Sequence, residues 1–417
     1  EVQRRSVSWR SMSQVPPLSD PASGPAPGLI ADVVAQHDAE LVELRRDLHA
    51  HPELSWGETR TTELVAERLE SVGWRLRPLT TTGCVADLGT GEGPITALRA
   101  DMDALPVHDV SGVPWASTVP GVAHACGHDV HTTALLGAAL ALGELHRRGE
   151  LPGRVRVLFQ PGEEVMPGGA LQLIAQNSLA DVARIFALHC EPAVDVGHIG
   201  MRAGSLTSAA DKLEVHLTGT GGHTSRPHLT GDLTFALAKV TTELPAVLSR
   251  RLDPRAGVSV VWGLVQAGSA VNVIPEHGMV GGTVRILDAE AWAQCEPIVR
   301  EAVLDIVRPY GVTARVDYVQ GVPPVANDPG CNAIVSAAAL SVLGPAGQTA
   351  VPQSLGGEDF GWYTARVPGA MFRLGTRTPG GPTYDLHQGN LRVDERAIGL
   401  GARLLAEAAI TGLVTDV

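Results

Sequence analysis

Three apolar segments that each run into polar side chains constrain the fold of this chain more than any other feature. They read "PITALRAD", "GRVRVLFQ" and "ARIFALH", and the polar groups at their ends are Asp101, Asp103, Glu163, Glu164 and His189. Near-continuous apolar strands that alternate with helical segments predict an α/β sheet covered by helices on both faces. Ligands of such sheets bind beyond the carboxyl ends of the strands, so these five side chains predict a site at that edge.

A second unit interrupts this pattern in the middle of the chain. Residues 208–320 contain, in order, an alternating strand, a helix, two strands, a helix and a strand. The order β-α-β-β-α-β is that of a ferredoxin-like α+β unit. We therefore expect a catalytic α/β domain with a mixed central sheet, built from residues 29–207 and 321–417, and an inserted domain at 208–320.

Composition excludes several classes of function. Residues 1–28 are rich in Pro, Ser and Gly and lack the apolar core of a signal peptide, so we expect disorder there. The net charge of −13, without a basic cluster beyond the N-terminus, argues against nucleic acid and anionic membranes as partners. The 5 scattered cysteines form no disulfide framework and favour a cytoplasmic location. No apolar run reaches the roughly 18 residues that span a bilayer.

The segment "HACGHDVH" concentrates side chains that bind metals or move protons. Cys126 and His128 form a C-x-H pair, and a thiolate with an imidazole suits zinc or a similar borderline metal. We expect Cys126 just before a helix over about Thr132–Arg148, where the helix dipole favours a thiolate. The alternative is a buried structural cysteine beside a helix-capping Asp129.

The two adjacent carboxylates of "QPGEE" can serve different functions. One carboxylate can bind a metal while its neighbour accepts a proton, as a metal-assisted hydrolase requires. The alternative is a solvated turn. For His189 in "ALHCEP", the alternative is a histidine of the core. For His387 in "YDLHQGN", it is an exposed loop histidine. Jointly, the candidate ligands are too many for one tetrahedral ion and suit two bridged ions: Cys126, His128, Glu164, His189 and His387.

Several further segments carry a family resemblance over nearly all of residues 41–395. They read "RRDLHAHPELSWGE", "ALRADMDALPV", "HACGHDVHTTALLGAA", "FQPGEE", "ALHCEP", "GTGGHTSRPH", "GSAVNVIPEHGMVGGTVR", "GGEDFGWY" and "LHQGN". Together, in this order, they resemble the amidohydrolase branch of the aminoacylase/carboxypeptidase superfamily of di-metal metallopeptidases. That branch includes N-acyl-amino-acid amidohydrolases, hippurate hydrolases and auxin-conjugate hydrolases. The resemblance implies that the inserted unit is a dimerisation or lid domain.

The resemblance also implies roles for single residues. The five candidate ligands match the metal ligands of the family, and Glu163 matches the general base that takes a proton from the attacking water. Asp103 matches a buried carboxylate that orients the site. Asp101 stands where relatives outside this branch have a ligand histidine, so its role stays open. Asp129 is a candidate acceptor for the ring of His128.

Three positions of the inserted domain resemble substrate contacts. His223 matches a histidine that polarises the scissile carbonyl, in some relatives from the partner subunit. Asn272 and Arg285 match groups near the substrate carboxylate, which the fork of an arginine suits. The alternatives are a turn at Asn272 and an ion pair of Arg285 within its own sheet.

The resemblance implies an enzyme that cleaves N-acyl amino acids to a carboxylate and a free amino acid. It implies two divalent ions per subunit, zinc or manganese, and a homodimer formed through the inserted domain. A dipeptidase or carboxypeptidase with the same site is the first alternative. A non-catalytic binding protein is the second, although no ligand residue is lost. A zinc nucleoside deaminase is excluded because its P-C-x-x-C element is absent.

Overall fold

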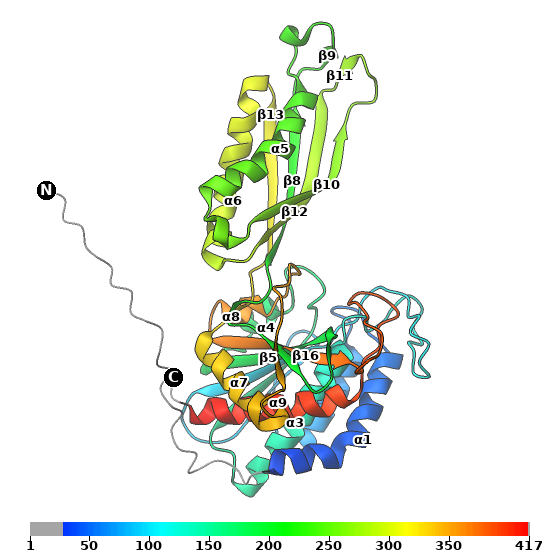
Figure 1. Ribbon diagram of the computed structural model, residues 1–417, viewed down its shortest axis with the longest axis vertical. Coiled ribbons are helices and arrows are strands. Elements are labelled where there is room, and N and C mark those ends of the chain that lie inside the picture. The colour runs from blue at the N-terminus through cyan, green and yellow to red at the C-terminus, as the bar shows by residue number, and fades with distance from the viewer. Residues whose placement is uncertain (1–27, 416–417) are drawn as a thin grey trace, which may run out of the picture.

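The computed structural model describes residues 28–415, and apart from Gly28 the disorder expected over residues 1–28 lies outside them. Figure 1 shows two bodies, a larger one that contains both described ends of the chain and a smaller one built from its middle. The larger body is a mixed sheet with helices against both faces, and the smaller one is a four-stranded sheet with two helices. This arrangement confirms the predicted fold class.

Eight strands form the sheet of the larger body in the order β1-β2-β4-β3-β5-β16-β6-β15. Strands β4, β3, β5 and β16 run parallel to one another, whereas β2 and β6 are antiparallel to their neighbours β4 and β16. The carboxyl ends of the parallel strands therefore meet at one edge. The strands are β1 (Arg75–Arg77), β2 (Cys84–Leu88), β3 (Ile95–Asp101), β4 (Arg154–Gln160), β5 (Val182–Asp195), β6 (Ile199–Met201), β15 (Gln348–Ala350) and β16 (Gly369–Arg377).

Helices cover this sheet unequally. One face carries a large core with α1 (Leu29–Ala50), α2 (Thr59–Ser71), α3 (His128–Arg148), α7 (Pro329–Leu343) and α9 (Arg396–Val414). The other face carries a smaller core with α4 (Ala170–Ala175) and α8 (Gly361–Thr364). A short pair of strands, β7 (Gly204–Ser205) and β14 (Ala326–Asn327), lies beside it.

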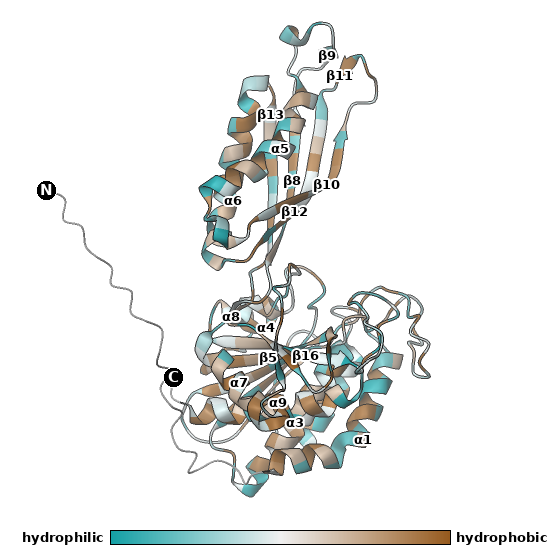
Figure 2. Cartoon of the chain, viewed as in Figure 1, coloured by the Kyte–Doolittle hydropathy of each residue, from teal (hydrophilic) through white to brown (hydrophobic). Residues whose placement is uncertain are grey.

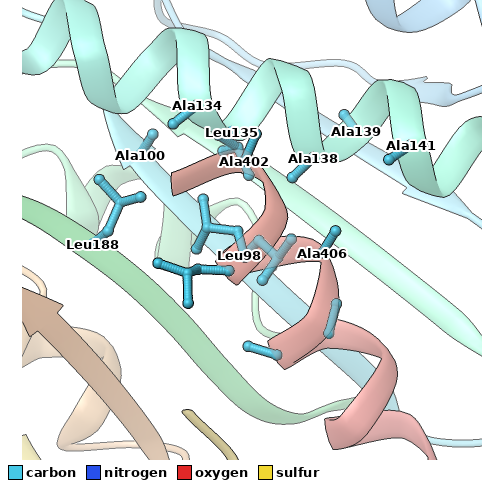
Figure 3. Packing of buried hydrophobic residues seen from close by; sticks show 14 of the residues in the cluster. Leu98, Ala100, Ala134, Leu135, Ala138, Ala139, Ala141, Leu188, Ala402 and Ala406 are labelled. Atoms are coloured by element: carbon cyan, nitrogen blue, oxygen red, sulfur yellow. The ribbon is translucent and has the colours of Figure 1, made fainter. Parts of the chain in front are cut away.

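Small residues let α3 and α9 approach each other closely. Figure 3 shows alanines of α3 and α9 facing one another above Leu98 of β3. A Cβ added at Gly137 would lie 2.8 Å from the Cβ of Ala402, so any side chain there would force the helices apart. The tight contact holds the N-terminal end of α3, and with it His128, in place.

Helix α9 is long and apolar enough to cross a membrane by length and composition alone, which the sequence expectation missed. In the structure, 61% of its apolar window is buried, and it packs against α1, α3 and α7. Figure 2 shows apolar residues along both α3 and α9. Helix α9 is therefore a central helix of the larger core.

The smaller body follows the predicted β-α-β-β-α-β order. Its sheet has the order β10-β12-β8-β13, all antiparallel, and the helices cover one face over a separate core. A two-stranded extension, β9 with β11, lies at the end farthest from the larger body (Figure 1). The elements are β8 (Ala209–Thr218), β9 (Gly222–His223), α5 (Leu233–Arg251), β10 (Ser259–Ala267), β11 (Val273–Ile274), β12 (His277–Ile286), α6 (Ala289–Val307) and β13 (Thr313–Val322), with one-turn 3₁₀ helices at Pro227–Leu229, Pro254–Ala256 and Arg308–Tyr310. We retain 208 and 320 as the proposed boundaries of this domain.

Two chain crossings join the bodies, one before β8 and one after β13 (Figure 1). Beside them, Asp211 accepts hydrogen bonds from Nε1 of Trp292 at 2.8 Å, the hydroxyl of Tyr318 at 2.6 Å and the backbone N–H of Gly321 at 2.9 Å. The ring of Trp292 also meets that of Trp362 in α8, with centroids 5.8 Å apart. These contacts and the two crossings form a neck between the two bodies.

Candidate metal centre

A cavity of about 490 Å³ lies at the carboxyl edge of the parallel strands. Six of its lining residues are predicted site residues: Cys126, Glu163, Glu164, His189, Arg285 and His387. Arg285 comes from β12 of the smaller body, and the others come from the larger one. Of the five polar groups predicted to share a site at the strand ends, Glu163, Glu164 and His189 line this cavity, whereas Asp101 and Asp103 do not.

Cys126, His128 and His189 form the buried side of the cluster. Their ligand atoms lie within 4.8 Å of one another, and the Sγ of Cys126 is 3.6 Å from Nε2 of His189. His128 is fully buried, and its Nε2 is 3.8 Å from Oε1 of Glu164. The predicted helix start at Thr132 was four residues late, because Gly127 adopts a positive φ of 83° and α3 begins at His128.

Glu164 and His387 close the outer side of the cluster. The Nε2 of His387 lies 3.4 Å from Oε1 of Glu164, and both group with Cys126 within 4.8 Å. His387 has a φ of 61°, which non-glycine residues rarely adopt, and its backbone N–H donates to the carbonyl of Ala125 at 2.8 Å. The loop thus holds the imidazole toward the cavity at some conformational cost.

The donor atoms fit divalent cations. Both ring nitrogens of His128 and Oε1 of Glu164 are buried without a hydrogen-bond partner among the described residues. Buried polar atoms are rarely left unpaired in proteins, and a bound cation satisfies such atoms when several of them converge. Burial raises the pKa of the Cys126 thiol, so a cation is needed to hold it as thiolate. The thiolate and the imidazoles suit zinc, whereas carboxylate and histidine ligation also suits manganese.

Asp103 and Asp101 lie behind His128. Oδ1 of Asp103 is 3.4 Å from Nδ1 of His128, while its Oδ2 accepts from Ser55 at 2.7 Å and from the N–H of Glu164 at 2.9 Å. Asp103 is thus fixed behind the ring of His128 without a hydrogen bond to it among the described residues, and its orienting role stays a prediction. Asp101 is held by Nδ1 of His131 at 2.5 Å, and Nε2 of His131 accepts from the backbone of Cys190 at 2.8 Å. Asp101 and His131 therefore brace the start of α3.

Asp129 does not orient the ring of His128 in this structure. Its carboxylate accepts from Nδ1 of His49 at 2.7 Å and lies 2.8 Å from Nε of Arg45. Both partners lie in α1. The segment "RRDLH" belongs to the family motifs, but nothing in it indicates that its side chains pair with Asp129. The link ties α1 to the segment that carries the candidate ligands.

Glu163 lies among other carboxylates. Burial raises its pKa, and the charges of Glu358, Glu164 and Asp359 raise it further. A base with a raised pKa retains a proton more readily, which suits a group that must take up and release one. Glu358 and Asp359 belong to "GGEDFGWY", and sequence reasoning assigned them no role because acidic pairs in loops are common.

A buried arginine, Arg99, pairs with two of these carboxylates, Glu358 and Asp359. Arg99 donates to Asp101 at 2.6 Å and to Asp359 at 2.7 Å, and its Nη2 lies 3.2 Å from Glu358. Sequence reasoning missed Arg99 because arginines within strands are usually exposed. A second arginine, Arg373, lines the cavity itself.

Two predicted substrate contacts lie elsewhere. His223 is exposed in β9, and Asn272 is exposed just before β11, in the extension at the far end of the smaller body (Figure 1). Neither lines the cavity of its own chain. Arg285 does, which agrees with a substrate contact, and it forms no ion pair within its sheet among residues 28–415.

The sequence and fold resemble those of known proteins. The family model for peptidase family M20/M25/M40 matches residues 97–411. An N-acetyl-L-cysteine deacetylase of Bacillus subtilis is 36% identical over 378 residues, which cover 89% of this chain and 88% of that protein. The solved structure of the YXEP protein of Bacillus subtilis, a dinuclear metal binding peptidase from the M20 family, matches with a TM-score of 0.80 at 33% identity and covers 92% of this chain and 100% of that one.

A longer relative shows the same similarity over part of its length. A Rhodococcus jostii protein named "Putative glutamate--cysteine ligase 2-3" is 48% identical over 371 residues, which are 88% of this chain but 46% of that protein. The chain thus spans less than half of that relative.

Proposed function

The chain belongs to peptidase family M20/M25/M40, and from that premise we propose that it hydrolyses N-acyl amino acids to a carboxylate and a free amino acid. The membership confirms the predicted resemblance and makes the chain a metal-dependent hydrolase of amide bonds. The finer proposal rests on one observation. Candidate metal-ligand atoms without hydrogen-bond partners cluster beside Glu163, at a cavity that Arg285 and Arg373 also line.

Five residues would hold two divalent cations, zinc or manganese: Cys126, His128, Glu164, His189 and His387. When bound, such cations supply Lewis acidity for the scissile carbonyl and lower the pKa of water at the site. Asp103 keeps the imidazole of His128 in one orientation, because its other oxygen is fixed by Ser55 and the backbone.

Glu163 is the proposed general base. It takes a proton from the attacking water and then passes that proton to the leaving nitrogen, so that the amide C–N bond breaks and the amino acid leaves neutral at nitrogen. Arg285 faces the same cavity and is the proposed contact for the substrate carboxylate.

His223 and Asn272 enter this proposal through a partner subunit. Both lie at the free end of the smaller body, away from the cavity of their own chain. We propose a homodimer, formed through the inserted domain, in which this end reaches the cavity of the other subunit. His223 then polarises the scissile carbonyl. A cytoplasmic location completes the proposal, since all five cysteines are free and buried.

The test is turnover of a panel of N-acetyl and N-benzoyl amino acids and dipeptides by metal-stripped, zinc-loaded and manganese-loaded protein. We expect metal-dependent release of free amino acid from N-acyl substrates, lost in Glu163→Ala. Cleavage of dipeptides alone would replace the proposal with the peptidase alternative. No turnover of any substrate, with tight metal uptake retained, would favour a non-catalytic binding protein.

A further inference from the structure

Five arginines are buried within residues 28–415, and four of them have partners. Arg45 pairs with Asp129, Arg99 with Asp101 and Asp359, Arg156 with Asp87, and Arg184 donates to the carbonyl of Thr415. The fifth, Arg373, is 7% exposed, and its guanidinium has no hydrogen bond or ion pair with any described residue. No protein anion neutralises this guanidinium, so its positive charge is available to a group that enters the cavity that it lines.

Arg373 lies in the wall of the metal cavity. It sits in β16 directly opposite His189 of the parallel strand β5, and both residues line the cavity. Register partners on neighbouring strands direct their side chains to the same face of the sheet, so Arg373 lies beside a candidate metal ligand. Arg285 lines the same cavity from the smaller body.

Five carboxylates line the cavity, and none of them forms an ion pair with Arg373: Glu163, Glu164, Glu358, Asp359 and Asp385. Glu358 and Asp359 pair with Arg99 beneath the cavity floor. Glu164 lies against His387 and His128, where the cations are expected. None of these acids approaches Arg373 within ion-pair distance. Two bound cations would add positive charge beside Arg373 and increase its need for an anion.

We propose that Arg373 binds the α-carboxylate of the N-acyl amino acid from the catalytic sheet, in addition to Arg285 from the smaller body. The inference rests on the proposed function, since it names the group of that substrate that the cavity recognises. A planar guanidinium presents two parallel N–H donors to a carboxylate. A substrate carboxylate held there supplies the missing anion and positions the adjacent amide toward Glu163.

The test compares ligands that differ only in this charge. Affinities of N-acyl amino acids and of their carboxamides are measured by calorimetry on metal-loaded Glu163→Gln protein, with and without Arg373→Met. We expect Arg373→Met to weaken binding of the acids by roughly 10- to 100-fold, as for loss of a charged hydrogen bond, and to leave the carboxamides within about threefold. Arg373→Lys keeps the charge and should retain part of the preference.

Arg377→Met is the matched control, because Arg377 lies on the same strand but pairs with Asp195 outside the cavity. Equal weakening of acids and carboxamides would overturn the proposal and move Arg373 to the scissile carbonyl or to a structural role. Unchanged affinity for both would also overturn it. If Arg373→Met fails to fold, the comparison of Arg373→Lys with wild type decides. Absence of turnover by wild-type protein is a separate outcome and concerns the proposed function.

Discussion

The carboxylate of Glu164 and the imidazole of His387 meet across the candidate metal centre, with 3.4 Å between Oε1 and Nε2. One follows β4 and the other lies in a loop near the C-terminal end of the chain, so the fold alone brings them together. Their contact closes the outer side of the cluster that also contains Cys126.

Replacing His387 with Ala should remove one of the two proposed cations. The outer group would keep only Cys126 and Glu164, too few ligands for a stable divalent site. We expect metal content to fall from about two to about one ion per chain, measured by elemental analysis after dialysis. His51→Ala, on the surface of the same body, should leave the content unchanged; an equal loss there would argue against this assignment.

Glu163→Gln should abolish proton transfer without disturbing the cations. The amide has nearly the same shape but cannot accept the proton of water, so kcat should fall by about 10²- to 10⁴-fold. Metal content and substrate affinity should remain those of wild type. A fall in metal content would instead make Glu163 a ligand, as its place in a group with His128 and Glu164 would permit.

Arg99→Met should destabilise the larger body. It leaves the buried carboxylates of Asp101 and Asp359 without their cation, which costs about 3–5 kcal/mol for a buried pair. Urea denaturation would measure the loss in the free energy of unfolding. Arg255→Met is the control, since Arg255 pairs with Asp253 at the surface and should leave the midpoint unchanged.

Mixing two inactive variants should restore activity if His223 acts across a dimer. Glu163→Gln lacks the base, and His223→Ala lacks the group at the far end of the smaller body. In mixed dimers one of the two cavities contains both intact residues, so random exchange should recover about a quarter of wild-type activity. Activity that stays at the level of the separate variants would remove His223 from the cavity of the partner.

The thiols far from the cavity should be unreactive in the folded protein. Burial raises the pKa of Cys84 and Cys331 to about 12 and that of Cys295 to about 11. Only the thiolate is alkylated, so iodoacetamide at pH 8 should label these residues slowly until denaturant is added. Mass spectrometry of labelled peptides would check this, and rapid labelling of the native chain would contradict the burial of these thiols.

The candidate site was predictable from sequence to the extent that its residues stand at the ends of apolar strands. Period and turn signals locate those ends, and parallel strands bring them to one edge, which is why Glu163, Glu164 and His189 were found together. The same signals predicted the inserted unit and its strand order. They placed the start of α3 too late, since the left-handed conformation of Gly127 leaves no periodic trace.

The supporting residues were not predictable in this way. Asp129 pairs with a residue of α1 and not with His128. Arg99 pairs with Asp359, which lies 260 residues later in the sequence. Such pairings depend on which faces of distant elements meet, and a single sequence does not encode that in its local pattern. A role for Arg373 was not predictable for the same reason. Its burial distinguishes it from Arg377 on the same strand, and burial depends on the tertiary fold.

The neck between the bodies separates two properties of the cavity, its affinity for cations and the length of ligand that it accepts. Arg373 and the candidate ligands belong to one body and Arg285 to the other, while two chain crossings and the contact of Trp292 with Trp362 set the angle between them. A rotation at the neck changes the separation of the two arginines and leaves the cation cluster intact. Ion affinity therefore does not depend on the angle between the bodies, whereas the distance that a ligand must span between Arg285 and Arg373 does.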